Sequence, residues 1–189
     1  QSAIWSNNII TWNPSNATGG VWTGTIGSSA GTFSTALPTT TSLYTTSRRT
    51  RWANVVTTAN QILGPRSTEA IFFAGNVAKQ GGYFFFARMG FDLWTNGGRF
   101  FAGMHSATTV ITADPSALNN TVGFCIDSSD NGAISFLTRT TSSATKAPTG
   151  FTASSGAGYD LYIFVAPGSS TYGWRIVDVN SGLEKSGTA

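Results

Sequence analysis

Residues 81–137 read GGYFFFARMGFDLWTNGGRFFAGMHSATTVITADPSALNNTVGFCIDSSDNGAISFL, a segment in which aromatic and apolar runs alternate with glycine-rich turns. The turns are TNGG at residues 95–98 and DNG at residues 130–132, and such Asn-Gly pairs are typical of tight β-hairpins. The segment therefore predicts antiparallel strands joined by short turns, at residues 83–91, 99–105, 121–126 and 133–138.

The same pattern extends on both sides of this segment. Further strands are expected at residues 70–74, 160–166, 172–179 and from 183 onward. With about eight strands after residue 65 at hairpin spacing, and no helices alternating with them, the sequence predicts an all-β fold. The expected architecture is an antiparallel β-sandwich of the jelly-roll or lectin-like type.

Three stretches do not fit the strand pattern clearly. Residues 47–61 could form the single helix of the chain, although a strand is equally consistent with their composition. Residues 114–118 predict a turn or a single helical turn, and residues 142–158 predict a polar loop with room for one short strand at Phe151. We expect residues 1–46 to be an extended Ser/Thr-rich arm or strand set, and residues 47–189 to be the β-sandwich domain.

The composition excludes a disordered chain and points to exposure outside the cell. The 189 residues include 13 Phe, 6 Trp and 5 Tyr, enough to build a full core. Only 10% of the residues are charged, against about 25% in an average domain, so Ser, Thr, Asn and Gly must form most of the surface. Such a neutral surface suits an extracellular or virion-exposed protein better than a cytosolic enzyme.

The net charge of +3 reflects few charges rather than a basic face. The single cluster is RRTR at residues 48–51, and it favours a solvated basic loop or a contact between subunits over a nucleic-acid site. No segment approaches the ~18 apolar residues of a membrane span, and no signal peptide is recognisable. The start at Gln1 suggests a processed product or a piece of a longer protein.

Residues that could carry catalysis or bind a metal are sparse. Cys125 and His105 are the only cysteine and histidine, which excludes an internal disulfide and leaves a zinc site only with several carboxylates. A catalytic pair of these two residues stays open, although the apolar run around Cys125 favours a buried thiol. Residues 127–132, DSSDNG, partly match a calcium loop, but Thr138 stands where the bidentate glutamate is required, so a hairpin turn is favoured. The eight acidic residues are scattered singly, and no cofactor, metal ligand or catalytic residue is assigned.

Exposed aromatic side chains beside polar ones are the candidates for ligand contact. Trp94, Asn96 and Arg99 lie together at a predicted hairpin tip, where a ring could stack on a sugar. Tyr172 and Trp174 offer a second group of this kind. The alternative is that these tryptophans belong to the core, because β-sandwiches bury such rings.

Several motifs resemble a domain found in structural proteins of tailed bacteriophages, of the tail-fibre or receptor-binding type. They are RFFAGM at residues 99–104, ADPSALNN at 113–120, Gly123, DSSDN at 127–131, YDLYIF at 159–164 and the pair Pro167-Gly168. The resemblance covers residues 66–189. It implies a β-sandwich displayed on a virion, commonly as a trimer, with either adhesion to a host-surface glycan or a purely structural role. It brings no catalytic residue with it.

The sequence therefore predicts a non-enzymatic bacteriophage virion protein, a tail-fibre or receptor-binding module that attaches to a host-surface glycan. Its expected partners are further copies of itself, in a homotrimer, and other virion proteins, without nucleic acid or a membrane span. One alternative is a capsid decoration protein or another purely structural virion protein. A second alternative is a polysaccharide-cleaving enzyme of the lectin-like fold.

Overall fold

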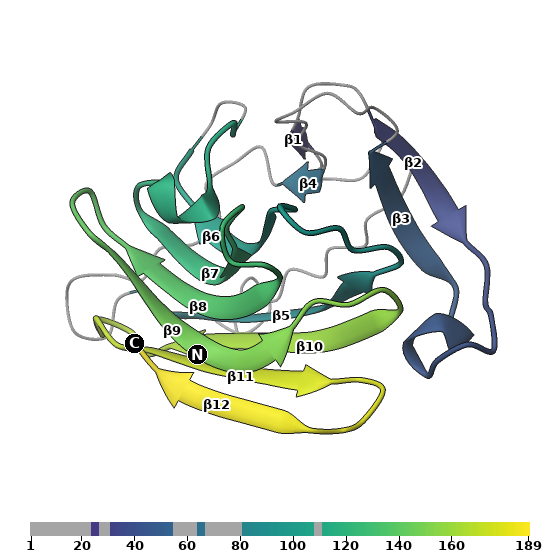
Figure 1. Cartoon of the computed structure of the whole chain (residues 1–189). Helices are drawn as coiled ribbons and strands as arrows, with labels where there is room; N and C mark the ends of the chain where they lie inside the picture. Colours follow the sequence, from purple (N-terminus) through teal and green to yellow (C-terminus); the bar gives the residue numbers. More distant parts are fainter. Residues whose placement is uncertain (1–23, 27–30, 55–63, 67–80, 108–110) are drawn as a thin grey trace, which may run out of the picture.

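The computed structural model describes residues 24–26, 31–54, 64–66, 81–107 and 111–189. Two four-stranded antiparallel sheets pack against each other (Figure 1). Sheet I has the strand order β12 (Glu184–Thr188), β11 (Tyr172–Asp178), β10 (Ala157–Val165) and β5 (Tyr83–Phe91). Sheet II has the order β6 (Phe100–His105), β7 (Thr121–Ile126), β8 (Ala133–Arg139) and β9 (Ala144–Thr152). The predicted all-β antiparallel sandwich is confirmed, whereas its jelly-roll or lectin-like classification stays a prediction.

The chain moves between the two sheets twice. It enters sheet I as β5, crosses to the edge of sheet II at β6, and runs through β7 and β8 to β9. It then returns to sheet I, where β10 pairs with β5 in an antiparallel register that joins Ala157 to Phe91 and Val165 to Tyr83. The result is that β5 has its described partner far along the chain, while each strand of sheet II pairs with a neighbour in sequence.

The turn at residues 95–98 is present but does not close a hairpin, which corrects the sequence-based expectation. The N–H of Gly98 donates to the carbonyl of Thr95 at 3.0 Å, as a turn requires. The strands on either side nevertheless lie in different sheets, because Phe91 and Phe100 both point into the shared core and contact each other edge-on at 5.1 Å. The turn at residues 130–132 does close a hairpin, with Asn131 at φ 52°.

The predicted polar loop at residues 142–158 is wrong, because most of it is strand β9. This strand pairs with β8, with an irregularity between Ile134 and Ser135, and forms the edge of sheet II. Of its side chains, only Thr149 and Phe151 are buried. An edge strand with one half-solvated face needs few apolar residues, which explains its polar composition.

The single helical turn expected at residues 114–118 is confirmed by the 3-10 helix η2 (Pro115–Ala117). The helix considered for residues 47–61 is wrong where the structure describes it, because Arg49–Asn54 forms strand β3. Strand β3 pairs with β2 (Gly31–Ala36), and the short strands β1 (Gly24–Ile26) and β4 (Gly64–Arg66) pair separately. The strand predicted at residues 70–74 lies outside the described residues.

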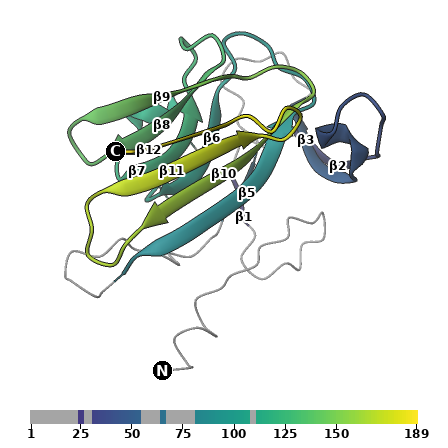
Figure 2. The ribbon, with the colours of Figure 1, turned by 90° about the horizontal axis from the view of Figure 1, so that it is seen from below.

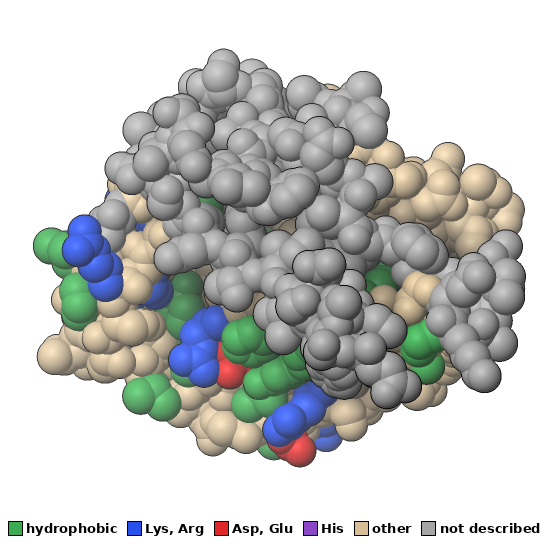
Figure 3. Space-filling view, turned by 180° about the vertical axis from the view of Figure 1, so that it is seen from behind, with side chains coloured by type: hydrophobic (Ala, Val, Ile, Leu, Met, Phe, Trp, Pro, Cys, Tyr) green, Lys and Arg blue, Asp and Glu red, His purple; other side chains and the backbone are tan. Residues whose placement is uncertain are grey.

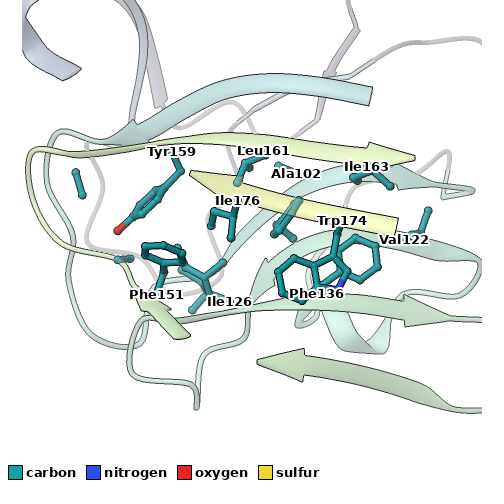
Figure 4. Packing of buried hydrophobic residues seen from close by; sticks show 14 residues of the cluster. Ala102, Val122, Ile126, Phe136, Phe151, Tyr159, Leu161, Ile163, Trp174 and Ile176 are labelled. Atoms are coloured by element: carbon teal, nitrogen blue, oxygen red, sulfur yellow. The ribbon is translucent and has the colours of Figure 1, made fainter. Parts of the chain in front are cut away.

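The core lies between the two sheets and is built by alternation along each strand (Figure 4). In β10, Leu161 and Ile163 point inward and are 1% and 0% exposed, while the intervening Tyr162 points outward. They meet Phe124 and Phe136 from sheet II, whose rings are edge-on at 5.4 Å. Each such fully buried side chain stabilises the fold by about 1.5–3 kcal/mol, so this layer holds the sandwich together.

A hairpin docks on one end of the sandwich, as Figure 2 shows for β2 and β3. The 3-10 helix η1 (Tyr44–Thr46) lies between these strands and makes the attachment. The N–H of Tyr44 donates to Oδ1 of Asn180 at 2.9 Å, and Oγ of Ser42 donates to the carbonyl of Gly156 at 3.1 Å. The division expected after residue 46 therefore falls inside this hairpin unit. Within the described ranges, no helix is long and apolar enough to span a membrane.

Candidate functional site

Trp94, Asn96 and Arg99 lie along the connection from β5 to β6. The ring of Trp94 packs edge-on against Phe91 at 4.9 Å and joins the border of the core. Asn96 is exposed at the turn. The guanidinium of Arg99 faces Asp114, with Nε 2.5 Å from Oδ1. Asn96 and Arg99 are therefore exposed as the ligand hypothesis requires, although Arg99 is paired with Asp114, whereas the ring of Trp94 is partly buried.

Tyr172 and Trp174 lie at the start of β11. Trp174 is 8% exposed and stacks on Phe136 at 5.9 Å, so its ring belongs to the core (Figure 4). The expectation of a ligand contact at Trp174 is therefore corrected, because a sugar ring cannot reach an indole that lies between two sheets. Tyr172 is half-buried and lines a hollow of about 250 Å³ with Arg139 and Thr145.

The two predicted groups lie at opposite ends of sheet I. Tyr172 is paired with Val165, which is paired in turn with Tyr83 at the first residue of β5. Trp94 follows Phe91, the last residue of the same strand. The nine residues of β5 therefore lie between the two groups. Because a strand rises by about 3.3 Å per residue, the two groups are too far apart to form one site.

An exposed aromatic cluster on the outer surface of sheet I is not among the sites predicted from the sequence. Phe84, Phe86 and Phe164 are 62%, 50% and 55% exposed, and Tyr162 lies among them. Phe84 is opposite Phe164 and Phe86 is opposite Tyr162 in the pairing of β5 with β10. The rings of Phe86 and Tyr162 are 4.9 Å apart. We call these four side chains the aromatic face.

Ion pairs border the aromatic face. Arg88 and Asp160, the next pair along β5 and β10, form two hydrogen bonds of 2.6 and 2.7 Å. The hydrogen bond to Asp160 raises the pKa of Arg88 above its ordinary value. On the other side Arg175 pairs with Glu184 and lies over the ring of Tyr162 at 5.4 Å. Figure 3 shows hydrophobic side chains beside such positive and negative groups on the back of the molecule.

The sequence did contain a signal for this surface. Alternation in residues 83–91 places Phe84, Phe86 and Arg88 on one side and Phe85 and Met89 on the other. The second side packs against the core. When only one side of a strand packs against a core, three consecutive Phe side chains cannot all be buried. At least one of the three rings therefore faces solvent.

A second candidate is the hollow between the hairpin and the end of sheet I, which we call the Arg51 hollow. It measures about 620 Å³ and is lined by Thr39, Thr41, Arg49, Arg51, Asp92 and Ser155, among others. The cluster at residues 48–51 was expected to be solvated or to contact another subunit. Alternation in β3 turns Arg49 and Arg51 toward Asp92, at 3.2 and 3.9 Å, and Arg48 and Arg51 are exposed, while a contact with another subunit stays a prediction.

A catalytic thiol and a calcium loop receive no support from the geometry. Cys125 is paired with Phe101 in the register of β6 with β7, and His105 with Thr121, so about 13 Å of strand separates the two side chains. Burial, followed by the nearby charge of Asp127, raises the pKa of the Cys125 thiol to about 12. Asp127 and Asp130 both accept from Lys146. Within the described ranges, no group of three His, Cys, Asp or Glu residues could hold a metal ion.

The remaining carboxylates are occupied as well. Asp114 accepts from Arg99 and from both N–H and hydroxyl of Ser128. Asp178 accepts from the backbone N–H groups of Asn180 and Ser181 in the turn after β11. Together with the pairs described above, these contacts engage each acidic side chain in the described part of the chain.

No family model matches the sequence, and no curated protein or solved structure matches it either.

Proposed function

We propose that this chain is a non-enzymatic β-sandwich module of a bacteriophage virion, of the tail-fibre or receptor-binding type, that attaches to a host-surface glycan. The observation that carries the proposal is the aromatic face, where Phe84, Phe86 and Phe164 are each at least 50% exposed on one sheet surface. Contiguous exposed apolar surface of this kind marks binding sites on soluble proteins. The resemblance of residues 66–189 to phage tail domains supports the same assignment.

The chemistry of the aromatic face suits a saccharide. Planar rings cover the apolar faces of sugar rings, and the two bordering ion pairs supply hydrogen-bonding groups for sugar hydroxyls. Arg88 and Arg175 are both about half exposed, so they can reach a bound ligand. Single contacts of this size are weak, and display in a homotrimer on a virion would strengthen them through linkage.

The engagement of the acidic side chains supports a binding role over polysaccharide cleavage. A glycosidase needs two carboxyls that face one bond, one of them free to donate a proton. Asp92, Asp114 and Asp160 instead accept hydrogen bonds from arginines. Release of reducing ends from a bound polysaccharide would contradict this part of the proposal.

The test is binding of the purified chain to an array of bacterial surface polysaccharides. We expect the Phe84→Ser/Phe86→Ser double variant to bind about tenfold more weakly or worse, because it loses the apolar contact area. Leu183→Ser is the matched control, since Leu183 is 56% exposed in the turn before β12, away from the four rings. Equal binding by the double variant and the control would overturn the proposal.

The second candidate is a purely structural role, such as capsid decoration, in which another subunit covers the aromatic face. The specific observation in its favour is that β5 is an edge of sheet I among the described strands, and apolar edge strands pair readily with other chains. Light scattering separates the two roles. A stable trimer that dissociates in the Phe84→Ser/Phe86→Ser variant would assign the face to assembly, whereas an unchanged mass with lost glycan binding would assign it to adhesion.

A further inference from the structure

We infer that the Arg51 hollow binds a saccharide that carries a carboxylate, with Arg51 as the group that recognises the negative charge. This inference rests on the proposed function, because it names the class of glycan that the module would select. It concerns a different part of the surface from the aromatic face, between β3, the loop before η1, and the residue after β5.

The charges in the hollow are not balanced. Asp92 is shared between two arginines, with its Oδ1 3.2 Å from Nη2 of Arg49 and its Oδ2 3.9 Å from Nη1 of Arg51. Two guanidinium groups therefore face one carboxylate. Counted over the described residues that line it, the hollow has a surplus of one positive charge, and a ligand with a single negative charge would neutralise it.

Arg49 is committed to the structure of the hairpin. Its Nη1 donates to the carbonyls of Thr45 and Ser47 at 2.9 and 3.0 Å, and its guanidinium lies over the ring of Tyr44 at 5.1 Å. The side chain is only 10% exposed. Arg49 therefore fixes Asp92 and the hairpin, and does not contact a ligand itself.

Arg51, in contrast, is available. Its side chain is 49% exposed, and its two contacts within the described ranges are long, at 3.4 Å from Oγ of Ser34 and 3.9 Å from Asp92. A guanidinium carries five N–H donors, so most of those on Arg51 can serve a ligand. Its planar fork matches a carboxylate through two parallel hydrogen bonds.

The walls of the hollow favour a saccharide as the carrier of that carboxylate. Thr39, Thr41 and Ser155 line it, and a hydroxyl group can both donate to and accept from sugar hydroxyls, although that of Thr41 already donates to Thr39 at 3.4 Å. Oγ of Ser155 already accepts from the backbone N–H of Trp94 at 3.0 Å, which fixes its position and leaves its proton for a ligand. A volume of about 620 Å³ lies within the ordinary range of small-molecule sites.

Calorimetric titration tests the inference with three probes. They are a glucuronate-containing trisaccharide, its carboxyl-reduced neutral counterpart, and inorganic phosphate. We expect the acidic trisaccharide to bind about tenfold to a hundredfold more tightly than the neutral one. Arg51→Gln should remove that difference, whereas Arg48→Gln, which makes the same charge change at an exposed neighbour, should preserve it.

Three results would overturn the inference. They are equal binding of the two trisaccharides, unchanged binding by Arg51→Gln, and phosphate binding as tight as that of the acidic trisaccharide, which would make the hollow a general anion site. The Phe84→Ser/Phe86→Ser variant separates this inference from the proposed function. If Arg51→Gln has no effect but the double variant loses binding on the polysaccharide array, the hollow assignment fails and the aromatic face stands.

Discussion

The ring of Tyr44 fills the space directly above Gly158. A Cβ placed on Gly158 would lie 2.2 Å from Cδ2 of that ring, far inside van der Waals contact. Gly90, the partner of Gly158 in the pairing of β5 with β10, completes the flat surface that receives the ring. The absence of two side chains is therefore what allows the hairpin to dock on sheet I.

Gly158→Ala is expected to loosen that docking. The added methyl cannot coexist with the ring, so we expect a loss of about 1–3 kcal/mol in the free energy of unfolding. Trypsin cleavage after Arg48 should become faster, because the hairpin would detach more often. Gly173→Ala is the control, since a Cβ there would meet only a carbonyl oxygen at 3.7 Å. Equal thermal melting of the two variants would contradict the packing described here.

Phe136 and Phe86 should respond very differently to the same substitution. Phe136 is 0% exposed at the centre of the core, and Phe136→Ala should lower the free energy of unfolding by about 3–5 kcal/mol. Phe86 is 50% exposed and its ring contacts that of Tyr162, so Phe86→Ala should cost about 1 kcal/mol. Chemical denaturation measures both. A large loss at Phe86 would show that its ring is a structural contact.

Asp114 should contribute to stability only above acidic pH. Its partial burial favours the neutral form, but hydrogen bonds from Ser128 and Arg99 outweigh this and lower its pKa below the ordinary value. A carboxyl whose folded-state pKa is lowered stabilises the fold above its unfolded pKa of about 4, and loses that effect as the pH falls through the folded pKa. We therefore expect Asp114→Asn to destabilise the protein at pH 7, with the difference from the parent protein shrinking toward pH 2. A difference that is constant with pH would contradict this prediction.

The thiol of Cys125 should be unreactive in the folded protein. It is 0% exposed, and burial raises its pKa to about 12, so the thiolate is almost absent at neutral pH. Iodoacetamide should label it only after unfolding by denaturant, as mass spectrometry would detect. Rapid labelling under native conditions would mean that β6 separates from β7.

The sequence was sufficient to predict β7 and β8 of sheet II, because their pairing is local, but it did not predict β9 at the edge of the same sheet. Residues 121–126 and 133–138 are joined by a tight turn that needs positive φ values at two positions. Asn131 and Gly132, which tolerate positive φ, occupy these positions with φ values of 52° and 88°. The pairing of β5 with β10 was not predictable in this way. Alternation describes which side of a strand is apolar, but it does not say which distant strand lies beside it.

The candidate site could be predicted only in part, because the exposure of an aromatic side chain depends on which sheet packs against its strand. In the sequence, Trp94 and Trp174 both lie beside polar residues in the pattern of a sugar site, yet Trp174 is stacked between the sheets. Phe84 and Phe86 look like core residues, yet they face outward because sheet I has its core on the opposite side. The position of Arg49 depends on Tyr44 and Asp92, and no local pattern connects these two residues.

The return of the chain from sheet II to β10 also determines the order in which the molecule can assemble. During synthesis, β5 leaves the ribosome well before its partner exists, because all four strands of sheet II lie between Phe91 and Ala157. Sheet II can form early from its local hairpins, whereas the Phe-rich β5 can pair with β10 only after the C-terminal part of the chain has been synthesised. A nascent chain that stops before residue 157 therefore leaves the edge of β5 that pairs with β10 without its partner, and the last 33 residues supply that partner.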